Sequence, residues 1–220
     1  MSHRDPVPDA ATDGDDTDTG KRKEILSGAR RVFRAQGFAG ASMDKIAQAA
    51  GVSKGTLYVY FRNKEELFAA LVLVDRRDAA ERMFQAEDLD ADPRAVLLDL
   101  GERFLRLMTT PDHIALIRMV MGAAEKFPEV GRMYFEKGPR RGIEHLARYL
   151  GEQVARGRLA IDEDYEMAAS HFLMMCQGTL TKRALFGHTA APTDADVRAT
   201  VESAVRVFMR AYGPERVGPR

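Results

Sequence analysis

Apolar residues recur every three or four positions along most of this chain, and polar, glycine or proline breaks separate the runs. This spacing is typical of amphipathic helices that bury one face. It predicts two short helices after residues 42 and 53, and longer helices over residues 21–36, 63–85, 92–108, 111–126, 129–156, 162–187 and 194–212. We therefore expect an all-α fold. A break is expected at Gly138-Pro139, because proline cannot continue helical hydrogen bonds.

The two short helices flank a tight turn at residues 50–53 and have the spacing of a helix-turn-helix. Ser42 and Ser53 are suitable N-caps for them, and Gly51 lies where a positive φ requires a residue without Cβ. Leu57 should pack the second helix onto the first. The residues just after Ser53 then face outward, where such a helix reaches base edges in the major groove of DNA. An ordinary αα-hairpin with a glycine turn is the alternative.

Positive charge is concentrated in this part of the chain. The whole chain has 33 Lys+Arg and 33 Asp+Glu, so it carries no net charge. Residues 20–64 nevertheless hold ten cations and two acids, a net charge of +8, whereas the acidic residues dominate positions 1–19. Tyr58, Tyr60, Arg62 and Lys64 add phenol hydroxyls and cations that suit phosphate oxygens. A local basic segment of this kind favours DNA binding.

The run GVSKGTLYVYFRNKEELF, which begins at Gly51, resembles the recognition-helix signature of the TetR/AcrR-type transcriptional regulators. Eight residues also match the spacing of this family: Phe33, Gly37, Phe38, Ser42, Ile46, Ala47, Ala50 and Gly51. The resemblance covers about residues 21–71. Tyr60 stands where many relatives carry histidine, and both side chains can donate to a phosphate. The stretch over residues 117–187 is similar to the AefR-like regulatory domains.

The resemblance implies an N-terminal three-helix helix-turn-helix domain, followed by a larger helical domain for ligand binding and dimerisation. We expect the first domain over residues 20–66 and the second over residues 67–213, with residues 214–220 as a tail. Residues 1–19 are rich in Asp, Thr, Pro and Gly, and we expect a disordered acidic tail. Its aspartates are either passive or compete with phosphate for the adjacent basic face.

The helices at residues 162–187 and 194–212 are expected to form the interface of a homodimer. The first is apolar on most sides, so it needs cover on two faces. Two helices from each of two subunits would make a four-helix interface, which the family resemblance also implies. A two-fold symmetric dimer reads two half-sites, and we therefore expect a palindromic operator in double-stranded DNA.

The sequence contains no catalytic constellation and no glycine-rich phosphate loop, and its five histidines lack the spacing of a zinc site. We therefore expect a protein that is not an enzyme and that needs no cofactor or metal. Cys176 has apolar neighbours, which favours an inert buried thiol over a redox sensor. The absence of a long apolar run and of a signal-peptide core predicts a cytoplasmic protein.

A pocket for a small molecule is expected in the second domain, because regulators of this type usually enclose one. The candidate lining residues combine apolar bodies with a few polar tips. They are His113, Met119, Phe127, Tyr134, His171, Met175 and Phe186. The alternative is that these residues belong to the plain hydrophobic core, where methionine fills gaps equally well.

The sequence thus predicts a sequence-specific transcriptional regulator, a repressor that a small-molecule effector releases from its operator. We assign base contacts to Lys54 and Thr56, with Gly55 allowing close approach of the backbone. The expected phosphate contacts are Ser42, Ser53, Tyr58, Tyr60 and Lys64. The helix that begins at Asn63 would carry the effector's signal. The alternatives are a helical small-molecule-binding protein or enzyme with a structural N-terminal bundle, and a protein that compacts DNA without sequence preference.

Overall fold

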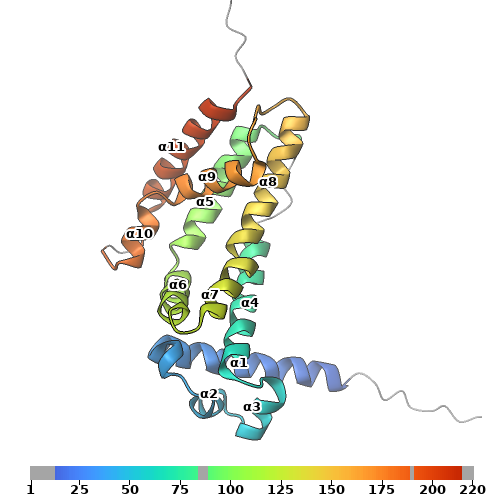
Figure 1. The fold of residues 1–220 in the computed structure, drawn as a ribbon, viewed down its shortest axis with the longest axis vertical. Coiled ribbons are helices and arrows are strands. Elements are labelled where there is room, and N and C mark those ends of the chain that lie inside the picture. The colour runs from blue at the N-terminus through green and yellow to red at the C-terminus, as the bar shows by residue number, and fades with distance from the viewer. Residues whose placement is uncertain (1–12, 84–88, 189–190, 215–220) are drawn as a thin grey trace, which may run out of the picture. The chain divides into compact units, whose positions relative to one another are not determined.

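The computed structural model describes residues 13–83, 89–188 and 191–214, and within these ranges every regular element is a helix (Figure 1). The prediction of an all-α fold is confirmed. The helices are α1 (Asp13–Gly40), α2 (Met43–Ala50), α3 (Lys54–Tyr60), α4 (Lys64–Met83), α5 (Pro93–Met108), α6 (Pro111–Ala124), α7 (Pro128–Lys137), α8 (Pro139–Ala155), α9 (Tyr165–Gln177), α10 (Leu180–Leu185) and α11 (Asp194–Tyr212). They form two compact units, and the boundary falls within α4, between Leu71 and Val72.

An aromatic cluster forms the centre of the first unit. Phe33 and Phe38 of α1 and Phe68 of α4 are all at most 2% exposed. Their ring centroids lie 5.1 to 5.8 Å apart. Gly37, between the first two rings, has a φ of 69° and interrupts α1 with a kink. The helix was expected to end there, but a further turn follows the kink and places Phe38 beside Phe33.

The first helix also begins earlier than the sequence indicated. Residues 13–19, which we assigned to a disordered tail, belong to α1, whereas residues 1–12 lie outside the described part of the chain. The backbone of this acidic segment, which has few apolar residues, is therefore helical rather than irregular.

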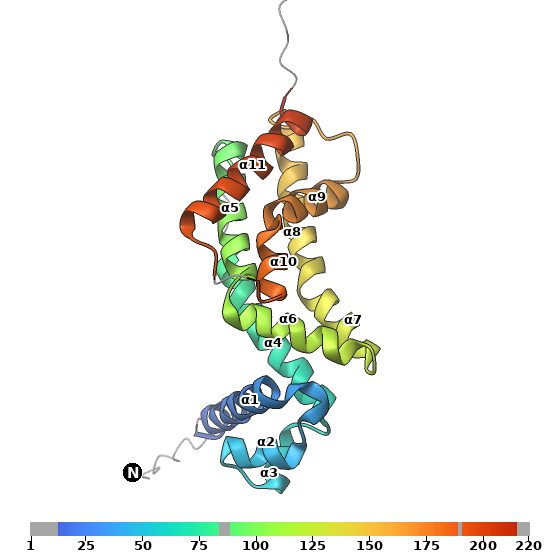
Figure 2. The same cartoon turned by 90° about the vertical axis from the view of Figure 1, so that its left-hand side faces the viewer.

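The second unit is organised around a core to which α5, α8, α9 and α11 contribute (Figure 2). Leu97, Leu100, Leu150, Phe172 and Phe208 are fully buried in it. The rings of Phe172 on α9 and Phe208 on α11 meet edge to face, with centroids 5.2 Å apart. The predicted apolar stripes therefore converge on one core, and α11 has the bounds that its periodicity predicts.

Two predictions about the continuity of helices in this unit had different outcomes. The predicted break at Gly138-Pro139 is confirmed, since α7 ends at Lys137 and α8 begins at Pro139. The prediction of one continuous helix over residues 162–187 was wrong. Gly178 has φ 51° and ψ −138° and separates α9 from α10. This backbone conformation is accessible to glycine and strained for other residues, so the helix cannot continue through it.

Candidate functional site

The turn between α2 and α3 has the geometry that the sequence predicts. The Ser42 hydroxyl accepts a hydrogen bond from the Lys45 N–H at 3.3 Å and caps α2. Gly51 ends α2 with a φ of 68°, a left-handed conformation that favours glycine. The Val52 N–H then donates to the Ala47 carbonyl at 3.1 Å, which closes the turn. These bonds fix the direction in which α3 leaves the turn.

The N-terminus of α3 is held by its own hydroxyl groups. The Ser53 oxygen accepts from the Thr56 N–H at 3.0 Å and lies 2.7 Å from the Thr56 hydroxyl. Leu57 is fully buried and anchors the inner side of α3. Lys54 and Gly55 are consequently exposed and Thr56 is half-buried, so the three predicted base-contacting positions lie together in the first turn.

Lys54 is paired with an acidic residue of the neighbouring helix. Its ammonium lies 2.7 Å from the carboxylate of Asp44, in the first turn of α2. A hydrogen bond to this carboxylate and its negative charge hold the pKa of Lys54 above its usual value. Lys54 therefore remains a cation, but Asp44 balances its charge in the protein without DNA.

Val59 is a surface residue that the sequence analysis missed. It lies on the seven-residue helix α3, and it is 83% exposed. The signal was present in the sequence, because Val59 falls outside the apolar stripe that Leu57 and Phe61 define. An exposed apolar group on a helix of this kind suits contact with the methyl group of thymine. Tyr58, its neighbour, is 45% exposed and presents a phenol on the same helix.

Several cationic side chains lie near the end of α3 and the start of α4. Arg62 is exposed, and its Nε lies 3.8 Å from the Glu66 carboxylate. The Arg22 guanidinium of α1 lies 5.3 Å from the centroid of the Phe61 ring. Tyr60 is half-buried. Arg22 of α1 and Arg62 of the segment between α3 and α4 thus place positive charge near the end of α3, and such cations suit contact with phosphate groups.

Lys64, one of the expected phosphate contacts, is held by contacts within the protein. Its ammonium donates to the Ala41 carbonyl at 3.3 Å and lies 4.5 Å from the centroid of the Phe38 ring. The side chain is half-buried and ties the start of α4 to the segment before α2. Lys64 therefore has a structural role beside any contact with DNA.

Two side-chain hydrogen bonds cap the start of α4. The Asn63 side-chain oxygen accepts from the Glu66 N–H at 2.7 Å. The Glu66 carboxylate accepts from the N–H of Arg62 at 2.9 Å, one residue before the cap. Both bonds still satisfy otherwise unpaired donors at the beginning of the helix.

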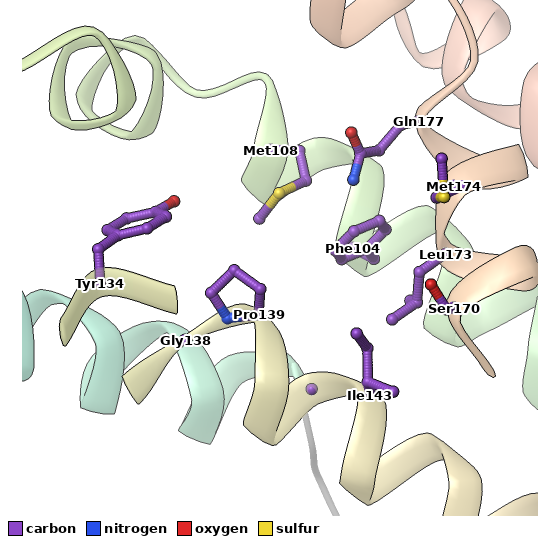
Figure 3. Close-up of a pocket in the computed structure, with 11 residues that line it drawn as sticks. Phe104, Met108, Tyr134, Gly138, Pro139, Ile143, Ser170, Leu173, Met174 and Gln177 are labelled. Atoms are coloured by element: carbon purple, nitrogen blue, oxygen red, sulfur yellow. The ribbon is translucent and has the colours of Figure 1, made fainter. Parts of the chain in front are cut away.

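A cavity of about 200 Å³ lies within the second unit (Figure 3). Its wall is formed by residues of α5, α7, α8 and α9 and of the break between α7 and α8. They are Phe104, Met108, Tyr134, Gly138, Pro139, Gly142, Ile143, Ser170, Leu173, Met174 and Gln177. Most of these groups are apolar, and the hydroxyls of Tyr134 and Ser170 and the amide of Gln177 add polar atoms to the wall.

Among the seven predicted pocket residues, Tyr134 is the one that lines this cavity. His113 is buried on α6, where Met119 is half-buried, and Phe127 precedes α7. His171 is exposed and lies 3.6 Å from Glu163. Of the remaining two residues, Met175 packs against the core and Phe186 is 86% exposed. The cavity does not bring these residues together, because its wall combines positions from four separate helices.

Other chemistry is limited in the described part of the chain. Burial raises the pKa of the Cys176 thiol to about 12, so this fully buried side chain stays protonated near neutral pH. The described residues contain no group of three or more His, Cys, Asp or Glu side chains that could hold a metal ion. None of the helices in the described ranges is long and apolar enough to span a bilayer.

The fold and the exposed second helix of a helix-turn-helix define a DNA-binding regulator of transcription. Two family models match this chain: "Bacterial regulatory proteins, tetR family" over residues 25–71, and "AefR-like transcriptional repressor, C-terminal domain" over residues 95–214. The second match alone covers more than half of the chain. The protein therefore belongs to the TetR family of bacterial transcriptional regulators, as the resemblance of its recognition helix indicated.

Solved structures and curated proteins agree with this assignment. The chain is 31% identical to the flavonoid-responsive regulator FrrA, with 90% of this chain and 100% of that chain covered and a TM-score of 0.80. A TetR-family regulator from Mesorhizobium loti is 27% identical, with coverages of 89% and 98% and a TM-score of 0.79. The repressor AcnR of Corynebacterium glutamicum is 42% identical over 66 residues, which are 30% of this chain and 35% of that protein.

Proposed function

We propose that this regulator represses transcription as a homodimer bound to a palindromic operator, and that a small molecule releases it. The observation that supports this function best is the first turn of α3, where Lys54, Gly55 and Thr56 lie together opposite the buried Leu57. Repression is supported by the AefR-like repressor model and by the relatives named as repressors. We assign this protein a binding role that requires no catalytic step. We place it in the cytoplasm, where bacterial DNA lies.

Base recognition is assigned to the exposed side of α3. Lys54 would donate to guanine acceptors in the major groove, and Thr56 would contact an adjacent base. Gly55 allows close approach, since its missing Cβ would lie 3.8 Å from the Ser53 hydroxyl and otherwise in open space. Val59 would contact a thymine methyl group. Phosphates on either side would be bound by Ser42, Ser53, Tyr58, Tyr60 and Lys64.

The dimer is assigned to α9 and α11, together with the short α10 between them. Four large apolar side chains of this region are at least half exposed in a single chain: Met167, Met174, Phe186 and Val207. Exposed apolar groups of this size mark association surfaces when they occur together. Regulators of this family dimerise, and a second subunit would supply the second recognition helix.

The effector is assigned to the cavity of the second unit. FrrA responds to flavonoids, which supports a small organic molecule as the signal for this chain as well. The helix α4 begins at the recognition domain and continues past the boundary between the units, so it is the covalent route for a signal. Release follows if the effector binds better to a conformation that does not fit the operator.

A binding-site selection from random DNA duplexes tests this function. The expected result is a two-fold symmetric motif with half-sites about 10 base pairs apart, bound by two chains per duplex. Enrichment without a motif would replace the proposal with non-specific DNA binding. A failure to enrich any duplex would favour the alternative in which the N-terminal bundle is only structural.

A further inference from the structure

The wall of the cavity in the second unit carries no charged side chain. Its eleven lining residues include no Lys, Arg, His, Asp or Glu. Phe104, Ile143 and Leu173 provide aromatic and aliphatic surface, and the thioethers of Met108 and Met174 are polarisable groups that adapt to aromatic rings. A charged molecule in this cavity would lose its hydration without gaining an opposite charge from the wall.

Three polar groups interrupt the apolar wall. Tyr134 of α7 and Ser170 of α9 each provide a hydroxyl, and Gln177 at the end of α9 provides an amide (Figure 3). The Ser170 hydroxyl and the Gln177 amide make no hydrogen bond to any other residue that the structure describes. Together these two groups offer donors and acceptors to a bound molecule.

The size of the cavity limits the molecule that it can hold. A cavity of about 150 Å³ lined by apolar side chains accommodates benzene. The volume of about 200 Å³ in this protein therefore suits a molecule of one or two rings. We propose that the cavity binds an uncharged, largely apolar compound of this size, whose one or two polar groups bond to Ser170 and Gln177.

The cavity also touches both helix breaks of the second unit. Gly138 separates α7 from α8, which begins at Pro139, and both residues line the cavity directly. Gln177 is the last residue of α9, and Gly178 follows it with a positive φ. The amides of Gly138 and Gly178 donate only long hydrogen bonds of 3.4 Å, to the carbonyls of Phe135 and Met174. Such breaks are the positions where two helices change their angle with little loss of hydrogen bonding.

Each of the two breaks adjoins a helix that contacts α6, namely α7 and α10. The Arg118 side chain of α6 donates to the carbonyls of Ala184 and Leu185, at the end of α10, at 2.9 Å each. On the other side α6 packs against α7. A ligand that fixes the angles at Gly138 and Gly178 therefore acts on the two helices that hold α6. This coupling rests on the proposed function, whereas the chemical class of the ligand follows from the cavity alone.

Two probes with the same ring system separate an uncharged ligand from a charged one. The full-length protein is titrated by calorimetry with 2-naphthol, which is neutral at pH 7, and with 2-naphthoate, which is an anion. The expected result is that 2-naphthol binds at least about tenfold more tightly, because the wall offers no counter-charge. Equal or tighter binding of 2-naphthoate would overturn the proposal.

Substitutions locate the probe in the cavity. Gln177→Glu introduces a charge of nearly the same shape and should weaken 2-naphthol binding at least about tenfold. Gln48→Glu makes the same change on the exposed surface of α2 and should leave binding unchanged. Gln177→Leu, which adds no charge, should lower affinity by about three- to tenfold through the lost hydrogen bond. Unchanged affinity in both Gln177 variants would place the probe elsewhere and overturn the assignment.

Amide hydrogen exchange tests the coupling to the helix breaks. Saturation with 2-naphthol should slow exchange of the Gly138 and Gly178 amides severalfold, and unaltered exchange at both would overturn the coupling. DNA binding is measured separately on the protein without probe. A protein that binds its operator but prefers 2-naphthoate refutes the cavity proposal alone, and one that binds 2-naphthol but no DNA refutes the proposed function alone.

Discussion

The ammonium of Lys54 lies 2.7 Å from the carboxylate of Asp44, and this ion pair joins the first turn of α3 to the first turn of α2. Both side chains are well exposed, so the pair adds little to stability. Its importance lies in its position, since it places a negative charge on the surface proposed to face DNA. Lys54 must leave Asp44 or share it when it contacts a base.

Asp44 is therefore expected to restrain non-specific DNA binding. In Asp44→Asn the freed Lys54 can contact any phosphate, so affinity for unrelated duplexes should rise about three- to tenfold and the salt slope should steepen by about one. Fluorescence anisotropy on a scrambled duplex measures both quantities. Asp99→Asn on α5, which removes the same charge from an exposed carboxylate paired with the partly buried Arg103, is the control and should change neither. Equal behaviour of the two variants would exclude this role for Asp44.

Lys54 itself is expected to determine part of the sequence preference. Lys54→Ala removes a direct base contact and should flatten the selected motif at one position, which corresponds to about 1–3 kcal/mol of discrimination. A binding-site selection with the variant provides the measurement. Lys126→Ala on the second unit is the control for loss of a surface cation. An unaltered motif for Lys54→Ala would show that the base contact lies elsewhere.

Lys64 is expected to affect both DNA binding and folding. Lys64→Ala should reduce the salt slope by about one, because one phosphate contact is lost on every sequence. It should also lower the free energy of unfolding by about 1 kcal/mol, since the contacts with the Ala41 carbonyl and the Phe38 ring disappear. Salt titrations and urea unfolding measure the two effects independently. A lower stability with an unchanged slope would leave Lys64 with a structural role only.

The dimer interface is tested at an exposed methionine. Met167 on α9 is 52% exposed, so Met167→Glu should leave the subunit folded but bury a charge in the proposed interface. Sedimentation should then show monomers at concentrations where the unmodified protein is dimeric, and operator affinity should fall accordingly. Met121→Glu changes a 65% exposed methionine of α6, outside the proposed interface, and should remain dimeric. Dimers of Met167→Glu would place the interface on other helices.

Gly178 is expected to be required for the break between α9 and α10. Gly178→Ala should destabilise the protein by about 2 kcal/mol, because alanine is strained at φ 51° and its Cβ would lie 3.0 Å from Thr200. Gly122→Ala, in the last turn of α6 with open space around the position, should instead stabilise by about 0.5–1 kcal/mol. Thermal unfolding of both variants measures the difference, and a stabilised Gly178→Ala would contradict the assignment of strain.

Local chemistry determined which parts of the fold the sequence could predict. The hydroxyls of Ser42 and Ser53 cap their helices, and Asp92 caps α5 in the same way, because these bonds involve residues two or three positions apart. The break at Gly178 was missed because the apolar periodicity continues across it. Its conformation accompanies a close approach to Thr200 of α11, which is distant in sequence.

The candidate site likewise has one part that the sequence could predict and other parts that it could not. The recognition turn lies within about twenty residues, so the spacing of Gly51, Ser53 and Leu57 was sufficient to predict it. The cavity wall combines Phe104, Ile143 and Gln177 from three helices, and no local pattern marks such a set. The Lys54–Asp44 pair also joins separate helices, and it became visible only once their relative orientation was known.

A competition titration measures sequence-specific DNA binding by this protein most directly. The operator recovered by selection is compared with a scrambled duplex of equal length and composition, at near-physiological salt and without added small molecules. We expect a preference of at least about 10³-fold for the operator. Equal affinities for the two duplexes would contradict sequence-specific recognition and would leave a protein that binds DNA through its charge alone.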